Sequence, residues 1–315
     1  MALPVLISRG HTEGLGAMLP LSMRAALLLL TIASPTATQT LAPRPVQAVL
    51  TGSFQDPDLR ESSGVTRSST QRGVLFTIND SGNPPEIFAI DSSGRPLGRW
   101  LVPGAGNRDW EALASGPCPA GTCFYIGDIG DNLERRPRIV IYRVRIPGLQ
   151  VFRGAADTGP LNLDSALVRY PDGAHDAEAM WVGDAGDVLI VSKGRNGGVR
   201  LYRVPASAFG RAQPVTAVLV QPVPIESSWF FGRLVTDAAR SPDGRRVALR
   251  TYSEIYLFPL LNGGRLAEPA IVCNIAGLEP QGEGIVWLDH RRLLLTSEAP
   301  TGTRAGPIHI VTCGG

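Results

Sequence analysis

Charged and aromatic residues are scarce in this chain, and neither sign of charge dominates. Only 18% of its 315 residues are charged and 6% are aromatic, and the net charge is +2. Proteins that bind nucleic acid or an anionic membrane surface carry a clear basic excess, which this balance does not provide. We therefore expect no nucleic acid partner, and any functional charge must be local.

Short motifs of several enzyme classes are also missing. The sequence has no G-x-S-x-G, no H-E-x-x-H, no Walker-type glycine loop and no G-x-G-x-x-G after a strand, which disfavours a covalent serine mechanism. The four cysteines lack paired C-x-x-C spacing, which argues against zinc. Cys118 and Cys123 can instead staple a short hairpin loop, and Cys273 and Cys313 can form a second bridge.

No apolar run is long enough to span a bilayer. The run AALLLLTIA, residues 25–33, is followed by small and polar residues, as in a secretory signal peptide. We expect residues 1–40 to be removed, with Met18 and Met23 as alternative start positions, and residues 41–315 to form a single domain. The mature protein should be secreted or periplasmic, where disulfides persist.

What the chain does have is many turn residues, 36 glycines and 26 prolines, and an internal repeat. Five segments share one four-residue pattern. In order, it consists of an aliphatic residue, a residue with a ring, any residue, and a second aliphatic or an aromatic residue. Their ring positions are Phe88, Tyr142, Tyr202, Tyr256 and His309, separated by 54, 60, 54 and 53 residues. Two β-rich runs precede each segment, and a fourth run follows all but the last. Four runs per copy are typical of one propeller blade.

The repeat predicts an all-β fold, a five-bladed β-propeller of four-stranded antiparallel blades. The missing fourth run of the last copy is available at residues 46–54, VQAVLTGSF, which precede the first copy. We expect this N-terminal strand to complete the fifth blade and close the ring, because closure removes exposed strand edges.

The first run of each copy is expected to line the central channel, where side chains two apart point the same way. One tier of that channel would contain Ser63, Glu111, Glu178, Asp237 and Glu283. A second tier would contain Glu61, Asp109, Asp176, Val235 and Gln281. Like charges in a partly dehydrated space cost several kcal/mol unless they are compensated. An alternative is that these acids bond backbone N–H groups and hold the blades together.

Oxygen ligands without thiols or paired histidines favour Ca²⁺, with Mg²⁺ second. The end of the second run adds Asp128, aligned with Asp80 and Glu298, while Lys193 and Tyr252 take this place in the third and fourth copies. The predicted calcium ligands are therefore Glu61, Asp109, Glu111, Asp128, Glu178, Asp237 and Glu283. The predicted substrate-binding residues are Arg108, Lys193 and Tyr252.

One histidine stands beside these acids. His175 directly precedes Asp176 and Glu178, and a histidine held by a carboxylate near a metal can act as a general base on water. We predict His175, Asp176 and Glu178 as the catalytic group. The alternative for His175 is an exposed loop histidine without a catalytic role.

The motifs NDSGNPPEIFAID, RDWEALA, YIGDIGDN, HDAEAMW and SPDGRRVALRTYSEIYLF together resemble those of a group of secreted bacterial β-propellers of mostly unassigned function. In architecture alone, acids gathered on an axial ion are similar to the calcium-dependent propeller lactonases and esterases of the gluconolactonase and paraoxonase type. Those have six blades and mix asparagine into the ligand set, whereas this repeat gives five blades and few inner asparagines. The acidic channel is also similar to that of propeller phytases.

The resemblance implies a calcium-dependent hydrolase of lactones or other carboxylic esters, with a small-molecule substrate. We expect a monomer. Two alternatives stay open. A phytase-like phosphoesterase would need basic residues beside the ions. A non-catalytic propeller would bind a glycan, a peptide or an envelope partner, and the segment SSWFFGR, residues 227–233, is the aromatic loop expected to be exposed.

Overall fold

The computed structural model describes residues 41–119, 121–145, 163–300, 303 and 305–314. Contacts divide the chain into residues 1–40 and 41–315, and only the second unit is described here. The predicted signal peptide therefore lies outside the described residues. Within the described part of the chain, no helix has the length and apolar character needed to cross a membrane.

The strands of residues 41–315 lie where the repeat predicts them. The first strands of the copies are β2 (Ser62–Arg67), β6 (Trp110–Cys118), β10 (Ala177–Val182), β15 (Val235–Arg240) and β19 (Gly282–Trp287). The second strands are β3 (Leu75–Asn79), β7 (Gly121–Asp128), β11 (Val188–Ser192), β16 (Arg246–Thr251) and β20 (Arg292–Ser297). The third strands are β4 (Glu86–Ile90), β8 (Ile139–Arg145), β12 (Arg200–Val204), β17 (Glu254–Pro259) and β21 (Pro307–Cys313). The fourth strands are β5 (Pro96–Leu101), β9 (Leu163–Arg169), β14 (Val218–Pro222), β18 (Ile271–Asn274) and the N-terminal β1 (Arg44–Ser53).

These strands form sheets of eight, four, five and four strands. The eight-stranded sheet consists of two antiparallel runs of four, one from β15 to β18 and one from β19 through β20 and β21 to β1. A short parallel pairing of β1 with β18 joins the two runs. The short β13 (Val215–Thr216) adds to β9 in parallel, and two short 3-10 helices, η1 (Ala206–Ala208) and η2 (Asn262–Gly264), lie in connections.

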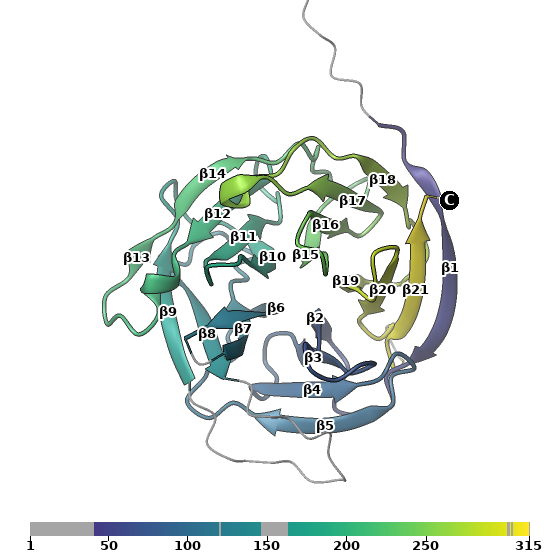
Figure 1. Cartoon of the computed structure of the whole chain (residues 1–315), viewed down its shortest axis with the longest axis horizontal. Helices are drawn as coiled ribbons and strands as arrows, with labels where there is room; N and C mark the ends of the chain where they lie inside the picture. Colours follow the sequence, from purple (N-terminus) through teal and green to yellow (C-terminus); the bar gives the residue numbers. More distant parts are fainter. Residues whose placement is uncertain (1–40, 120, 146–162, 301–302, 304, 315) are drawn as a thin grey trace, which may run out of the picture. The chain divides into compact units, whose positions relative to one another are not determined.

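The five inner strands pack against one another in a closed cycle, from β2 to β6, β10, β15, β19 and back to β2. Figure 1 shows them around a common centre, with the third and fourth strands of each copy further out. Close approach requires small residues. At Gly64, for example, φ is +75° and a Cβ atom would lie 2.6 Å from the backbone nitrogen of Leu113 on the neighbouring strand. Apolar clusters between successive sheets form the core, such as the one that joins Ile141 of β8 to Met180 of β10.

The N-terminal strand pairs with the last strand, as the repeat predicts. Val46 of β1 is opposite Cys313 of β21, and Arg44 of β1 is opposite Cys273 of β18. The disulfide Cys273–Cys313, with Cα atoms 5.8 Å apart, joins the two strands that flank β1.

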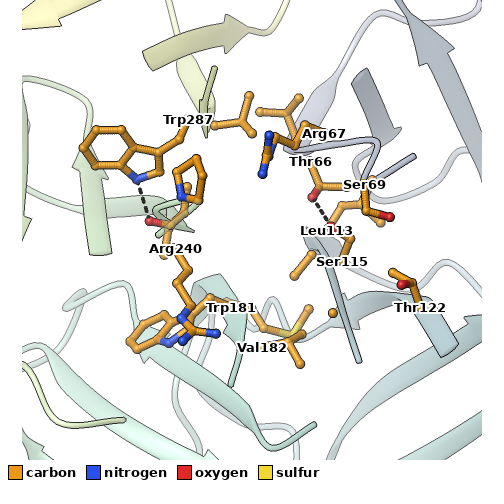
Figure 2. A pocket seen from close by; sticks show the side chains of 18 of the residues that line it. Thr66, Arg67, Ser69, Leu113, Ser115, Thr122, Trp181, Val182, Arg240 and Trp287 are labelled. Atoms are coloured by element: carbon orange, nitrogen blue, oxygen red, sulfur yellow. Dashed lines mark hydrogen bonds between the residues drawn. The ribbon is translucent and has the colours of Figure 1, made fainter. Parts of the chain in front are cut away.

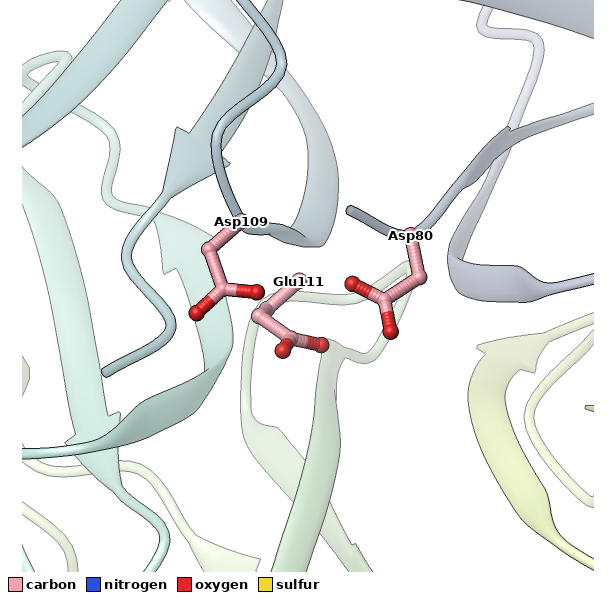
Figure 3. Close-up of side chains that lie close together, drawn as sticks. All are labelled: Asp80, Asp109 and Glu111. Carbon is pink, nitrogen blue, oxygen red and sulfur yellow. The ribbon is translucent and has the colours of Figure 1, made fainter. Parts of the chain in front are cut away.

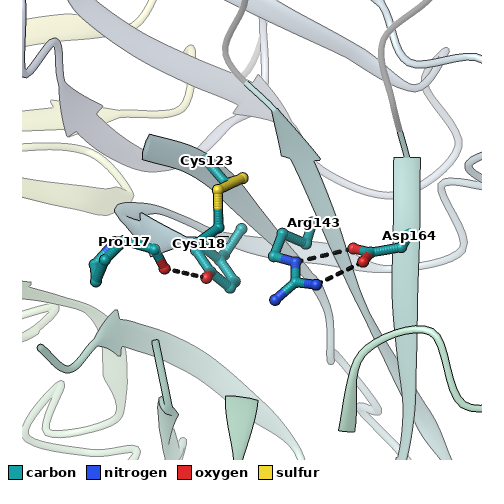
Figure 4. Close-up of a disulfide and its surroundings, with 6 residues drawn as sticks. Pro117, Cys118, Cys123, Arg143 and Asp164 are labelled. Atoms are coloured by element: carbon teal, nitrogen blue, oxygen red, sulfur yellow. Dashed lines mark hydrogen bonds and ion pairs between the residues drawn. A yellow bond between two sulfur atoms is a disulfide. The ribbon is translucent and has the colours of Figure 1, made fainter. Parts of the chain in front are cut away.

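The second disulfide, Cys118–Cys123, links β6 to β7 across their turn. Figure 4 shows it near the ion pair of Arg143 with Asp164, whose closest atoms lie 2.6 Å apart. Both predicted cysteine pairings are confirmed.

The two disulfides should differ in their contribution to stability because they close loops of different length, with sequence separations of 40 and 5 residues. Loop-closure entropy predicts that Cys273→Ser with Cys313→Ser lowers the free energy of unfolding by about 4 kcal/mol, and that Cys118→Ser with Cys123→Ser lowers it by about 2 kcal/mol. Chemical denaturation of both double variants measures the difference. An equal or larger loss for the short loop would contradict this account of ring closure.

Candidate functional site

Acidic side chains gather at the beginning of the inner strands, as the alignment predicts. Glu111, Glu178 and Glu283 are each the second residue of their strand, and all three are buried. Ser63, the second residue of β2, donates from Oγ to Glu111 Oε2 over 3.0 Å. Burial raises the pKa of Glu111, and the negative charge of Glu283 adds to that rise. Glu111 and Glu283 therefore share one electrostatic environment.

Three carboxylates come closest together within this end of the strands. Asp80, Asp109 and Glu111 each offer an oxygen, and these oxygens all lie within 4.8 Å of one another. Figure 3 shows the three carboxyl groups facing a common space. Asp80 follows β3, Asp109 directly precedes β6, and Glu111 belongs to β6. We refer to Asp80, Asp109 and Glu111 as the acidic triad.

Local sequence holds the acidic triad in place. Asn107 Nδ2 donates to the carbonyl oxygen of Asp80 over 2.8 Å, and Asn107 Oδ1 accepts from the backbone nitrogen of Trp110 over 3.1 Å. The end of β3 is thereby tied to the start of β6. Gly130, in the segment YIGDIGDN, leaves the space that the carboxylates occupy, because a Cβ atom there would lie 2.5 Å from Asp109 Oδ2 and 2.7 Å from Glu111 Oε1.

The negative charges of the acidic triad perturb one another. Burial, followed by the charges of Asp80 and Asp176, raises the pKa of Asp109 to about 6. Burial, followed by the charge of Asp80, raises the pKa of Glu111 well above its ordinary value. The folded protein therefore holds these groups in an arrangement that disfavours their full ionisation unless a cation is near.

The one lysine of this region lies among the acids. Lys193 is buried, its Nζ pairs with Glu178 Oε1, and it lies 5.5 Å from the centroid of the Tyr252 ring. The Tyr252 hydroxyl donates to Glu283 Oε1 over 3.2 Å. Burial raises the pKa values of four acids here, Asp80, Glu111, Glu283 and Glu298, and the positive charge of Lys193 opposes part of each rise. The structure thus brings the predicted pair Lys193 and Tyr252 together beside the acidic tier.

Two predicted acids are neutralised by arginines. Asp128 Oδ1 lies 2.7 Å from Nη2 of Arg136, and both side chains are buried. Asp176 Oδ2 lies 2.8 Å from Nε of Arg195. Asp128 and Asp176 therefore already have a cation, and they brace the connection after β7 and the one after β11. The third predicted substrate-binding residue, Arg108, is exposed and lines a hollow of about 390 Å³ together with Asp109 of the acidic triad and Arg136.

Asp237 is bonded to the backbone. Its carboxylate accepts from the nitrogen of Ala238 over 2.7 Å and from the nitrogen of Ile285 on β19 over 2.8 Å. Complete burial raises its pKa well above the ordinary value, and the backbone donors oppose that rise. This geometry matches the alternative in which inner acids hold neighbouring strands together. Glu61, in contrast, is exposed and accepts from Asn83 Nδ2 over 2.6 Å.

His175 lies in an aromatic cluster. Its ring is 5.4 Å from the ring of Tyr170 and 5.6 Å from that of Tyr202, and its Nε2 lies 3.2 Å from Asp172 Oδ1. It is buried, which differs from the exposed loop histidine considered above. Among the described residues, His175 makes no hydrogen bond, ion pair or ring contact with the acidic triad.

Sequence reasoning selected Asp128 from the end of the second run and left out Asp80 and Glu298. Alignment placed all three at one level, but it did not show that Arg136 pairs with Asp128. Burial and the charges of Glu283 and Asp80 raise the pKa of Glu298 to about 8.

The aromatic loop, residues 227–233, is exposed as expected. Trp229, Phe230 and Phe231 are 63%, 89% and 59% exposed.

No family model matches the chain, and no curated protein is similar to it in sequence. Among solved structures, a PQQ-bound aldose sugar dehydrogenase from Streptomyces coelicolor is similar over 86% of this chain and 99% of its own, with 12% identity and a TM-score of 0.51. A gluconolactonase from Xanthomonas campestris covers 85% of this chain and 90% of its own, with 12% identity and a TM-score of 0.42. An auxiliary nutrient binding protein from Bacteroides thetaiotaomicron covers 87% and 78%, with 10% identity and a TM-score of 0.44. The similarity to the aldose sugar dehydrogenase shows a shared fold and nothing more.

The raised pKa values predict how the stability of the metal-free protein depends on pH. The folded pKa values of Asp109 and Glu298, about 6 and about 8, lie above their ordinary values of 3.8 and 4.5. The stabilisation that these groups contribute is therefore complete below the ordinary values and is lost as pH rises through about 6 and about 8. In the presence of a chelator, we expect Tm to fall from pH 5 to pH 9.

Glu298→Gln should remove the fall in Tm around pH 8, because an amide does not titrate. The matched variant Glu268→Gln, at an exposed position, should keep it. Differential scanning calorimetry across this pH range measures both. A Tm for the Glu298→Gln variant that falls between pH 7 and pH 9 as steeply as that of the unmodified protein would show that Glu298 does not titrate in this window.

Proposed function

We propose that this protein is a hydrolase of lactones or other carboxylic esters that uses a divalent cation, Ca²⁺, held by Asp80, Asp109 and Glu111. The observation that carries the proposal is the acidic triad itself, three carboxylates whose oxygens lie within 4.8 Å of one another. Oxygen-only ligands suit hard cations, and Ca²⁺ tolerates irregular arrangements of carboxylates better than Mg²⁺ does.

Two further observations support a cation at this end of the strands. Glu178 Oε2 and Glu283 Oε2 are buried and have no hydrogen-bond partner among the described residues, and unpaired buried carboxylate oxygens are costly. The glycine at position 130 lets the carboxylates of Asp109 and Glu111 approach the backbone, because a Cβ atom there would collide with both. The nearby Lys193 is paired with Glu178 and so offsets only part of the negative charge.

The proposed division of roles follows from the contacts. The cation, when bound, would polarise the ester carbonyl and stabilise the oxyanion. Lys193 lies over the Tyr252 ring and pairs with Glu178. A lysine has three N–H donors, so Lys193 would orient the substrate through a donor that Glu178 does not use, with the Tyr252 ring beside it. Glu178 keeps one oxygen without a partner and would accept the proton of the attacking water. His175, stacked on tyrosines, is left outside this scheme.

We infer that the fold carrying this site is a β-propeller of five blades. Each four-strand run begins with one of the five inner strands, and these contact one another in a closed cycle. β1 serves as the fourth strand of the last run.

We also propose that the protein acts outside the cytoplasm, as a secreted or periplasmic monomer after removal of residues 1–40. The two disulfides support an oxidising compartment, because such bonds rarely persist where glutathione keeps thiols reduced.

A non-catalytic binding propeller is the second candidate, and one observation favours it. The loop that carries Trp229, Phe230 and Phe231 exposes three aromatic side chains together, and such rings supply stacking surfaces for a glycan or a peptide. A phosphate-binding site has less support, because Lys193 is paired with Glu178 and Arg250 is paired with Glu279 and bonded to backbone oxygens.

The proposal predicts both metal binding and metal-dependent turnover. Calorimetric titration should show Ca²⁺ binding that Glu111→Gln weakens by about tenfold or more, because a neutral amide replaces a charged ligand. Hydrolysis of a homoserine lactone or an aryl ester, and not of phytate, should be lost with EDTA and restored by Ca²⁺. Glu268→Gln, an exposed matched control, should leave both properties unchanged.

The outcomes separate the parts of the proposal. Ca²⁺ binding without turnover would contradict the proposed hydrolase activity and favour a non-catalytic binding propeller. Turnover that is insensitive to EDTA, or Ca²⁺ binding that is unchanged in the Glu111→Gln variant, would remove the triad as the metal site.

A further inference from the structure

A second cavity lies at the other end of the inner strands. It has a volume of about 360 Å³ and is lined by the last residues of all five of them, for example Thr66 of β2, Met180 of β10 and Trp287 of β19. The acids of the triad and its neighbours lie at the beginning of the same strands. Figure 2 shows side chains converging on this cavity from all around. Its size falls in the range of cavities that bind small molecules, about 300 to 1,000 Å³.

The charged side chains that line this cavity are all positive. Arg67 and Arg240 line it, and no aspartate or glutamate does among the described residues. Arg240 is already committed, because its guanidinium forms a bidentate pair with Asp184 at 2.6 and 2.8 Å. The side chain of Arg67 is exposed and makes no hydrogen bond or ion pair with another described residue, while its backbone pairs with Leu75 in the sheet. In Figure 2 its guanidinium group points into the cavity.

The remaining wall offers further donors and apolar surface. Trp181 is only 2% exposed, and its buried Nε1 has no hydrogen-bond partner among the described residues. The hydroxyls of Thr66 and Ser115 bond to each other over 3.0 Å and line the same cavity. Pro117 and Pro242, which are exposed, add apolar surface to the lining.

We propose that this cavity binds a small organic monocarboxylate, with its carboxylate on Arg67 and its apolar body against the apolar part of the lining, which includes Pro117 and Pro242. A planar guanidinium matches a carboxylate with two parallel hydrogen bonds, and the absence of acids from the described lining removes repulsion. One free arginine suits a single negative charge, and the apolar wall favours an organic anion over an inorganic one. The proposal is independent of the hydrolase proposed above, because it uses none of the same residues.

Titration with benzoate, and with benzyl alcohol as its neutral counterpart, tests the charge requirement. Benzoate should bind at least about tenfold more tightly than benzyl alcohol. Arg67→Gln should weaken benzoate binding by about tenfold or more, and Arg67→Lys by less, because a lysine keeps the charge but loses the paired geometry. Arg72→Gln is the matched control, since Arg72 is exposed nearby in the chain and does not line the cavity.

The location of binding is tested by the indole N–H signals of the five tryptophans in ¹H–¹⁵N spectra, with Trp181→Phe and Trp287→Phe to assign two of them. Benzoate should shift the Trp181 and Trp287 signals and leave that of Trp229 in place. The proposal is overturned if benzoate does not bind, if benzyl alcohol binds equally well, if Arg67→Gln has no effect, or if the shift occurs at Trp229.

Discussion

The packing of the inner strands against one another is the constraint on which the rest of the structure depends. Because β2, β6, β10, β15 and β19 contact each other in a cycle, their backbones approach closely and tolerate only small residues at positions such as Gly64. The same convergence gathers one end of every strand into a small volume. Side chains that are distant in sequence then share one electrostatic environment, and their identities decide what each end of the strands can bind.

The protein compensates most of the acids that this convergence brings together. Arginines neutralise Asp128 and Asp176, a lysine pairs with Glu178, and backbone N–H groups satisfy Asp237. Asp80, Asp109 and Glu111 have less compensation, and the pKa values of Asp109 and Glu111 are raised accordingly. Strongly perturbed pKa values cluster at functional sites. The other end of the strands has the opposite character, with arginines and no acids among its described lining.

The periodicity of the sequence predicted the strands, the closing role of β1 and the acidic tier, because a repeat fixes which residues occupy equivalent places. It did not predict partners that lie outside the repeat. Arg136 lies in the connection between β7 and β8, and the corresponding connections of the other copies differ in length, so its pairing with Asp128 could not be read from the alignment. His175 was predicted to be catalytic because Asp176 and Glu178 follow it in the sequence. In the structure its ring contacts Tyr170 and Tyr202. The close approach of Gly130 to Asp109 and Glu111 depends on the fold and could not be read from the repeat.

The central claim is that Asp80, Asp109 and Glu111 together hold a divalent cation, and a crystal structure determined with calcium present above pH 7 tests it most directly. The account predicts an anomalous difference peak between the three side chains, with carboxylate oxygens at about 2.3 to 2.6 Å from it. Well-defined carboxylates without a peak between them, sharing protons or bonded to water alone, would contradict the claim.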